Sequence, residues 1–166
     1  VIVIGPSHRI YLKGASVSLY DEYETPLGNI LIDKTFTENL IKEYDFLDFN
    51  IECEFEHSTE TQMPFIKHYF KDSLVVEIVY GDIDFNDLSE LIDNLLEDEN
   101  NFIVISTDLS HFHSEREAYK LDNNCINAIK NKDTISLKTY IEKTIEIELG
   151  ILNGIKSGNI SYFKRI

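Results

Sequence analysis

The sequence predicts an α/β fold in which one sheet is covered by helices on both faces. Three short runs, at 1–4, 74–80 and 102–106, are rich in β-branched and apolar residues. They are apolar on both faces, which is typical of central strands in a covered sheet. Helical patterns separate the three runs, so a sheet between two helical layers is the simplest architecture.

Start and stop residues place the first helices of this pattern. A helix is expected over 33–44, where Asp33 can cap the first turn. A second helix is expected within 58–70. Pro64 interrupts this stretch and favours a start near Met63, because proline is tolerated in a first turn.

Later segments complete the predicted layers. A stripe of leucine and isoleucine predicts an amphipathic helix over 86–97. Three successive helices are expected after the third strand, at 115–131, 133–143 and 145–156, and further strands at 15–20 and 160–163. A chain of 166 residues can bury one substantial core, so residues 1–166 are expected to form a single domain.

The acidic composition argues against partners that need a basic surface. Thirty acidic residues against fifteen basic ones give a formal charge of −15, which repels phosphate backbones and anionic membrane surfaces. Nucleic acids and membranes are therefore not expected as partners. The carboxylates are spread along the chain and fit either a solvated acidic surface or a metal-rich site.

Cysteine usage and hydropathy predict a cytoplasmic location. Cys53 and Cys125 stand in unlike contexts without CxxC spacing, which indicates neither a disulfide framework nor a structural zinc site. No apolar run approaches the roughly 18 residues of a membrane span, and no secretory signal pattern is present. A reducing compartment fits these features best.

Two histidines follow predicted strands. His8 follows 1–4, and His111 follows 102–106. Because ligands gather at the carboxyl ends of strands in open α/β sheets, the two imidazoles would meet if their strands are close. Imidazole suits metal ligation or proton transfer, and Asp108 could anchor one ring. The alternative is that both are turn residues whose ring nitrogens bond local backbone.

The remaining histidines carry weaker signals. His57 precedes a predicted helix and could reach the same region, whereas His68 is expected to be a packing or surface residue. His113 ranks behind its neighbour His111. The sequence motifs of serine hydrolases, P-loop enzymes and dinucleotide-binding enzymes are absent, so those classes lose support.

Four motifs in one order resemble those of a known family. They are Gly5-Pro6-Ser7-His8, then Thr25-Pro26-Leu27-Gly28 with Ile32-Asp33, then Glu56-His57-Ser58 with Met63-Pro64-Phe65, and finally Ser106-Thr107-Asp108-Leu109-Ser110-His111-Phe112. This pattern resembles the Memo-like family, whose bacterial and archaeal members are called AmmeMemoRadiSam system protein B. The resemblance implies a fold similar to that of the class III extradiol dioxygenases.

The same resemblance implies a metal site. The dioxygenases hold a non-haem Fe(II) with two histidines and a carboxylate, and His8 matches one of these histidines. His111 is similar to their acid/base histidine, and His57 to a second histidine that faces substrate. The third metal position of the family is usually a cysteine. Glu146 stands in its place here, either as a metal ligand or as an acid on a helix surface.

The sequence departs from the family pattern at both ends. It contains no Pro-His-Ala-Gly-Tyr loop, which carries the other metal-binding histidine of the family, and no closing Gly-Tyr-Ala-Ala strand. We therefore expect a domain that is shortened at both ends, either as such or as one segment of a larger protein.

Two functions are compatible with these observations. The first is a metal-dependent oxidoreductase related to extradiol dioxygenases, with Fe(II), or Cu, as its metal. The second is a non-enzymatic module that uses the same cleft for a peptide or a small-molecule ligand. A homo-oligomer is compatible with both, and the substrate cannot be read from the sequence.

Overall fold

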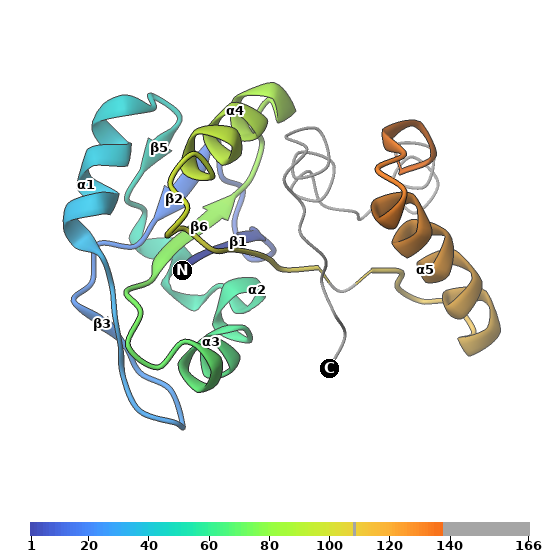
Figure 1. Ribbon diagram of the computed structural model, residues 1–166, viewed down its shortest axis with the longest axis horizontal. Coiled ribbons are helices and arrows are strands. Elements are labelled where there is room, and N and C mark those ends of the chain that lie inside the picture. Colours follow the sequence, from blue (N-terminus) through green and yellow to red (C-terminus); the bar gives the residue numbers. More distant parts are fainter. Residues whose placement is uncertain (108, 138–166) are drawn as a thin grey trace. The chain divides into compact units, whose positions relative to one another are not determined.

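A five-stranded sheet of order β5-β2-β6-β1-β7 organises the first part of the chain. In the computed structural model, which describes residues 1–107 and 109–137, its strands are β1 (Ile2–Pro6), β2 (Ala15–Val17), β5 (Leu47–Asp48), β6 (Val76–Tyr80) and β7 (Ile103–Ile105) (Figure 1). Strand β1 pairs in parallel with both β6 and β7, whereas β2 runs antiparallel to β6. The three strands expected from apolar runs are thus confirmed, with β1 between β6 and β7 and with β7 at the edge of the sheet.

The described residues divide into two compact units. The first unit is Val1–Asp84 with Asp98–Ser106, and it contains the whole sheet. It also holds a ribbon of β3 (Glu22–Tyr23) and β4 (Ile30–Leu31) and the helices α1 (Lys34–Glu43), η1 (Ile51–Phe55), α2 (His57–Glu60) and α3 (Met63–Tyr69). Of the described residues, the second unit comprises Phe85–Glu97, Thr107 and 109–137, and it contains α4 (Phe85–Leu95) and α5 (Glu115–Lys130).

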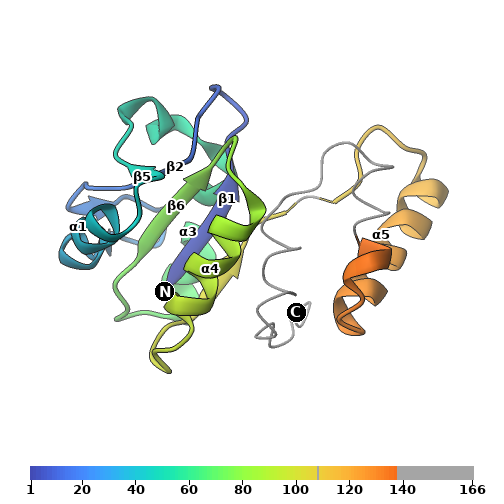
Figure 2. The same cartoon turned by 90° about the horizontal axis from the view of Figure 1, so that it is seen from above.

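Helices of the first unit lie on both faces of its sheet. Figure 1 and Figure 2 show α1 on one face and α2 with α3 on the other. Met63 and Ile66 of α3 pack against Val3 of β1 in a buried cluster. The predicted α/β architecture is confirmed at this level.

Local sequence signals set the helix starts as predicted. The Asp33 carboxylate accepts a hydrogen bond of 3.1 Å from the Phe36 backbone N–H and caps α1. Helix α3 begins at Met63 with Pro64 in its first turn. Residues 57–60 form a separate short helix, which the sequence pattern did not distinguish from α3.

The second unit confirms two further helices. The stripe predicted within 86–97 is buried in α4, with Leu88, Leu91, Ile92 and Leu95 inside. Helix α5 matches the expected helix over 115–131. The expected helix over 145–156 and the expected strand over 160–163 lie outside the described residues. Among the helices of the described part, none combines the length and apolar character that crossing a membrane requires.

Gly5 allows α2 to approach the centre of the sheet closely. A Cβ atom at position 5 would lie 2.6 Å from Ser58 Oγ and 3.1 Å from Thr59 Cγ2. The Ser58 hydroxyl donates a hydrogen bond of 2.8 Å to the Pro6 carbonyl, which ties the same helix to the end of β1. A glycine is therefore required where strand and helix meet.

Substituting Gly5 by alanine should push α2 away from β1. Overpacking of this kind costs about 1–3 kcal/mol of the free energy of unfolding, to be measured by urea denaturation. Ser58→Ala is the control, because it removes the bond to Pro6 without adding volume and should cost only about 1 kcal/mol. Equal losses in the two variants would contradict the role assigned to Gly5.

One carboxylic acid, Glu77, lies on the face of the sheet that helices α2 and α3 cover. Glu77 is the register partner of Val3, so its side chain projects to the side of the sheet that α2 and α3 cover. Thr59 Oγ1 donates a hydrogen bond of 2.5 Å to Glu77 Oε1. Burial raises the pKa of Glu77 against the opposing effect of this bond, and the nearby carboxyl groups of Glu56 and Glu60 raise it further.

This raised pKa gives a signed prediction for stability. Above the ordinary pKa of 4.5, the unfolded chain releases the Glu77 proton while the folded chain retains it. The contribution of Glu77 to the free energy of unfolding should therefore fall as pH rises from there through the folded pKa. Urea denaturation of the wild type and of Glu77→Gln at a series of pH values gives the free energy of unfolding of each protein. The difference between the two free energies should change as pH rises. A difference that stays the same at every pH would contradict the raised pKa of Glu77.

Candidate functional site

His8 stands in the loop that leaves the central strand β1. The Ser7 backbone N–H donates to the Tyr80 carbonyl at 2.8 Å, which continues the pairing of β1 with β6 by one residue. The Ser7 hydroxyl donates to the Ile10 carbonyl at 2.9 Å and closes the turn. Held in this way, the His8 side chain is 39% exposed at the carboxyl end of the strand.

Glu56 and His57 come from the junction of η1 and α2. The Glu56 N–H donates to the Cys53 carbonyl and ends η1, while its carboxylate accepts from the Ser58 N–H at 3.1 Å and caps α2. The Glu56 side chain is 2% exposed, whereas that of His57 is 49% exposed. The junction thus presents an accessible imidazole directly beside a buried carboxylate.

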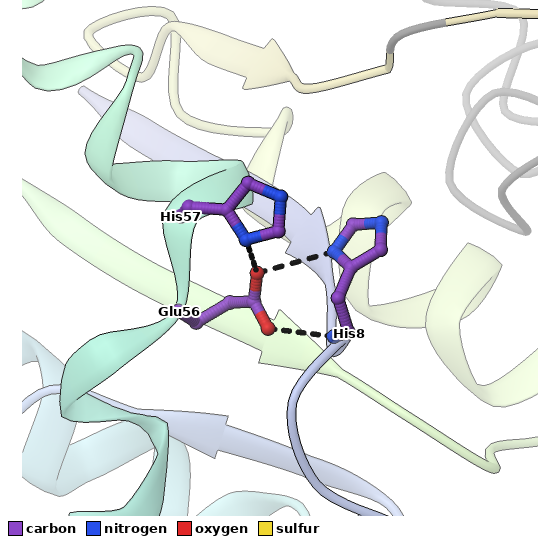
Figure 3. A group of neighbouring side chains, drawn as sticks. All are labelled: His8, Glu56 and His57. Atoms are coloured by element: carbon purple, nitrogen blue, oxygen red, sulfur yellow. Dashed lines mark hydrogen bonds and ion pairs between the residues drawn. The ribbon is translucent and has the colours of Figure 1, made fainter. Parts of the chain in front are cut away.

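The carboxylate of Glu56 joins the two histidines (Figure 3). Glu56 Oε2 accepts from the His8 backbone N–H at 2.6 Å. Glu56 Oε1 lies 3.1 Å from His8 Nδ1 and 3.0 Å from His57 Nδ1. The ring centroids of the two histidines are 4.7 Å apart. We call these three residues the His8–Glu56–His57 triad.

Hydrogen bonding keeps the triad carboxylate ionised. Burial opposes the charged form, but N–H bonds from His8 and Ser58, together with the His8 ring, outweigh it and lower the pKa of Glu56. An ionised carboxylate only accepts hydrogen bonds, so each Nδ1 atom that bonds it carries the hydrogen. The Nε2 atoms of neutral imidazoles in this state keep their lone pairs.

This arrangement suits a metal ion. One potential ligand atom from each triad residue lies within 4.8 Å of the others. Figure 3 shows the Nε2 atoms of both rings directed away from Glu56. A carboxylate that binds the far nitrogen of a ligating histidine fixes its tautomer and orientation and strengthens it as a ligand. The triad therefore brings together side chains of the kind that hold a metal ion.

The structure brings two of the sequence-predicted site residues together. His8 and His57 both belong to the triad. Asp108 and Glu146 lie outside the described residues, so their proposed roles stay predictions. Sequence reasoning missed Glu56, although it stands in the same motif as His57 and its position directly before a helix was visible.

His111 lies in the second unit, in a backbone segment of unusual conformation. Strands β1 and β7, which precede His8 and His111, are direct neighbours in the sheet. Leu109 and Phe112 have φ values of 62° and 58°, in the left-handed region that costs energy for bulky residues. The Ser110 N–H donates to Asp122 Oδ1 at 3.1 Å, which ties the segment to α5. Such strain is typical of functional segments, and the acid/base role of His111 stays a prediction.

The other expected site features can be placed as well. His68 is exposed on α3, and the centroid of its ring lies 4.7 Å from that of the Tyr69 ring. Cys53 and Cys125 are both buried free thiols. Burial raises the pKa of Cys53. This keeps its reactive thiolate form scarce, as expected of a structural cysteine.

Sheet and triad together define an α/β protein with a histidine–carboxylate site at the end of a central strand. Residues 1–150 match the family model described as Memo-like protein, and the chain belongs to the Memo-like family. It is 33% identical to a MEMO1 family protein of Methanobrevibacter smithii over 82% of this chain and 50% of that protein. It is 28% identical to the protein memo-1 homolog of Caenorhabditis elegans over 87% of this chain and 47% of that protein.

A third relative gives a similar result. The chain is 32% identical to a MEMO1 family protein of Aquifex aeolicus over 82% of its own length and 53% of the relative. It thus spans about half the length of the curated relatives it matches. The family resemblance expected from the four motifs is confirmed.

The triad geometry predicts the effect of Glu56→Gln. The substitution replaces one carboxylate oxygen, which accepts hydrogen bonds, with an NH₂ group, which donates them. The Nδ1–H groups of His8 and His57 therefore lose one of the oxygens that can accept from them. We expect a loss of about 1–3 kcal/mol of the free energy of unfolding and a shift of the His8 and His57 tautomers, seen in ¹⁵N NMR spectra of the imidazoles. Glu52→Gln, an exposed change in η1, is the control. Unchanged imidazole spectra in Glu56→Gln would refute the anchoring role of Glu56.

Proposed function

We propose that this chain is the metal-binding core of a Memo-like protein, in which His8 and His57 offer their Nε2 atoms to a transition-metal ion. The observation that carries the proposal is the shared Glu56 carboxylate, which bonds both Nδ1 atoms and so leaves both Nε2 atoms for a ligand. Imidazole nitrogen with carboxylate support suits Fe(II) or Cu. Glu146 is the proposed third ligand.

This assignment gives His57 a role different from the one implied by family resemblance. The resemblance made His57 a residue that faces substrate, but it shares an anchor with His8 and lies beside it. We propose that the fold is that of the class III extradiol dioxygenases, supported by the parallel pairing of β1 with β6 and β7. In that fold the site would serve redox chemistry.

Each residue then has a defined part in the proposed reaction. The metal, when bound, would supply redox and Lewis-acid chemistry. Glu56 holds both rings in one tautomer and stabilises the positive charge that either ring acquires. His111, if it reaches the substrate, moves the proton as acid or base. The side chains of His8 and His57 are 39% and 49% exposed, so a small molecule can reach both rings from solvent.

Metal titration tests this proposal. Purified protein should bind Fe(II) or Cu(II) near one equivalent under anaerobic conditions, measured by elemental analysis and isothermal titration calorimetry. His8→Ala and His57→Ala should each weaken binding by roughly 10-fold or more, because each removes one imidazole ligand. His68→Ala, an exposed imidazole on α3, is the matched control and should bind as the wild type does.

The two histidine variants also separate the two roles of His57. If His8→Ala loses the metal and His57→Ala retains it, His57 is not a metal ligand, as the family resemblance implied. If neither variant differs from His68→Ala, the triad is not a metal site.

A second function is supported by the surroundings of the triad in the sequence. Phe55, directly before Glu56, is 68% exposed, and Tyr11 and Ile51 are exposed as well. Apolar side chains of this kind suit contact with a peptide or a small apolar ligand. The module would then bind its partner without metal. Binding that persists in EDTA and is weakened by Phe55→Ala would support this second function over the first.

A further inference from the structure

A second polar cluster lies on the sheet face that α2 covers. Ser18 follows β2, and its backbone N–H donates to the Glu77 carbonyl at 3.3 Å, one position beyond the register pair of Val17 with Ile78. Residues opposed in this way project to the same face, with Cβ atoms about 4.5–5.5 Å apart. The Ser18 hydroxyl and the Glu77 carboxyl are therefore neighbours.

The hydroxyl of Ser18 has no partner in the described part of the chain. Ser18 is 6% exposed, and no hydrogen bond reaches its Oγ atom from residues 1–107 or 109–137. Buried hydroxyl groups are normally hydrogen-bonded, and an orphan one points to a missing water, ion or ligand. Thr59 is the side chain that donates to Glu77, and it donates to Oε1. The second carboxylate oxygen of Glu77 therefore receives no hydrogen bond from the described residues.

The cluster is acidic and lined by tyrosines. Burial raises the pKa of Tyr23, and the negative charges of Glu77 and Glu60 raise it further. Burial also raises the pKa of Tyr20, whose hydroxyl donates to Glu54 Oε2 at 3.2 Å. Among the described residues, Glu54, Glu60 and Glu77 form no ion pair with a Lys or Arg side chain.

The cluster carries negative charge and, among the described residues, has free hydrogen-bond acceptors. It therefore suits a cation that donates hydrogen bonds. We propose that the Ser18–Glu77 cluster, made of Ser18, Tyr20, Tyr23, Thr59, Glu60 and Glu77, binds the primary ammonium group of a small alkylamine. Such a group has three N–H donors, for Ser18 Oγ and the two carboxylates, and aromatic rings add cation–π attraction. This site is separate from the proposed metal site and does not depend on it.

A divalent metal fits the cluster less well. Among the described residues, the group of three or more metal-ligating side chains is the His8–Glu56–His57 triad, and no second group includes Glu77. Serine and threonine hydroxyls with one or two carboxylates leave an alkali cation as the rival occupant. The two differ in directionality, because an ammonium donates hydrogen bonds and an alkali ion does not.

NMR titration of the 166-residue chain distinguishes these occupants. Butylammonium chloride, tetramethylammonium chloride and potassium chloride are added separately in an amine-free buffer at constant ionic strength. Butylammonium should shift the backbone amide signals of Ser18, Tyr23 and Glu77 saturably. Tetramethylammonium has no N–H donor and should not. Saturable shifts with potassium that compete with butylammonium would overturn the ammonium assignment, and equal linear shifts with all three salts would overturn the site.

Two substitutions locate the binding. Glu77→Gln should weaken butylammonium binding roughly tenfold or more, since it removes a charge-assisted hydrogen bond. Glu38→Gln, which removes one exposed charge from α1, is the matched control and should bind as the wild type does. Circular dichroism checks that both variants fold. Equal affinities of Glu77→Gln and the wild type would overturn the proposal.

Ser18→Ala supplies an independent test that holds even where Glu77→Gln fails to fold. It removes the orphan hydroxyl, so the amine-free protein should unfold at a higher urea concentration than the wild type. The same variant should lose several-fold in butylammonium affinity. A variant that gains stability and keeps the wild-type affinity would show that Ser18 does not contact an amine, and it would overturn the proposal.

Discussion

The buried carboxylate of Glu56 is the interaction on which the candidate site depends. It accepts from the backbone N–H groups of His8 and Ser58 and lies within hydrogen-bond distance of the Nδ1 atoms of two imidazoles. These contacts join the loop after β1 to the start of α2. One ionised group thereby fixes the backbone of both segments and the tautomers of both rings, which is the orientation that the proposed metal site needs.

Two glutamates near α2 behave in opposite ways, and the difference lies in their hydrogen bonds. N–H donors to both oxygens of Glu56 lower its pKa in spite of burial. Glu77 receives one hydroxyl bond and has acidic neighbours, so burial prevails and raises its pKa. The number of hydrogen-bond donors around a buried carboxyl group thus decides whether its pKa is lowered, as for Glu56, or raised, as for Glu77. Glu56 supports the proposed metal site, and Glu77 the proposed amine site.

Close approach of strand and helix makes both sites possible. Gly5 lets Ser58 and Thr59 lie against β1, which places His57 beside His8 on one side and Thr59 beside Glu77 on the other. The shared helix α2 has only four residues, His57–Glu60, and most of them contribute a contact to one of the two sites. The motif Glu56-His57-Ser58 therefore has two roles, since it packs helix α2 against the sheet and also supplies side chains to the candidate site.

The sequence by itself determined the family, the central strands and several helix starts, because these depend on neighbours in the chain. The Asp33 cap and the Pro64 start of α3 are local signals of this kind. Only the tertiary structure revealed the role of Glu56, whose bond to His8 spans 48 positions, and the pairing of Ser18 with Glu77. Short strands such as β5 carried no periodic signal either. Contacts between distant residues are set by register and packing, which no local pattern encodes.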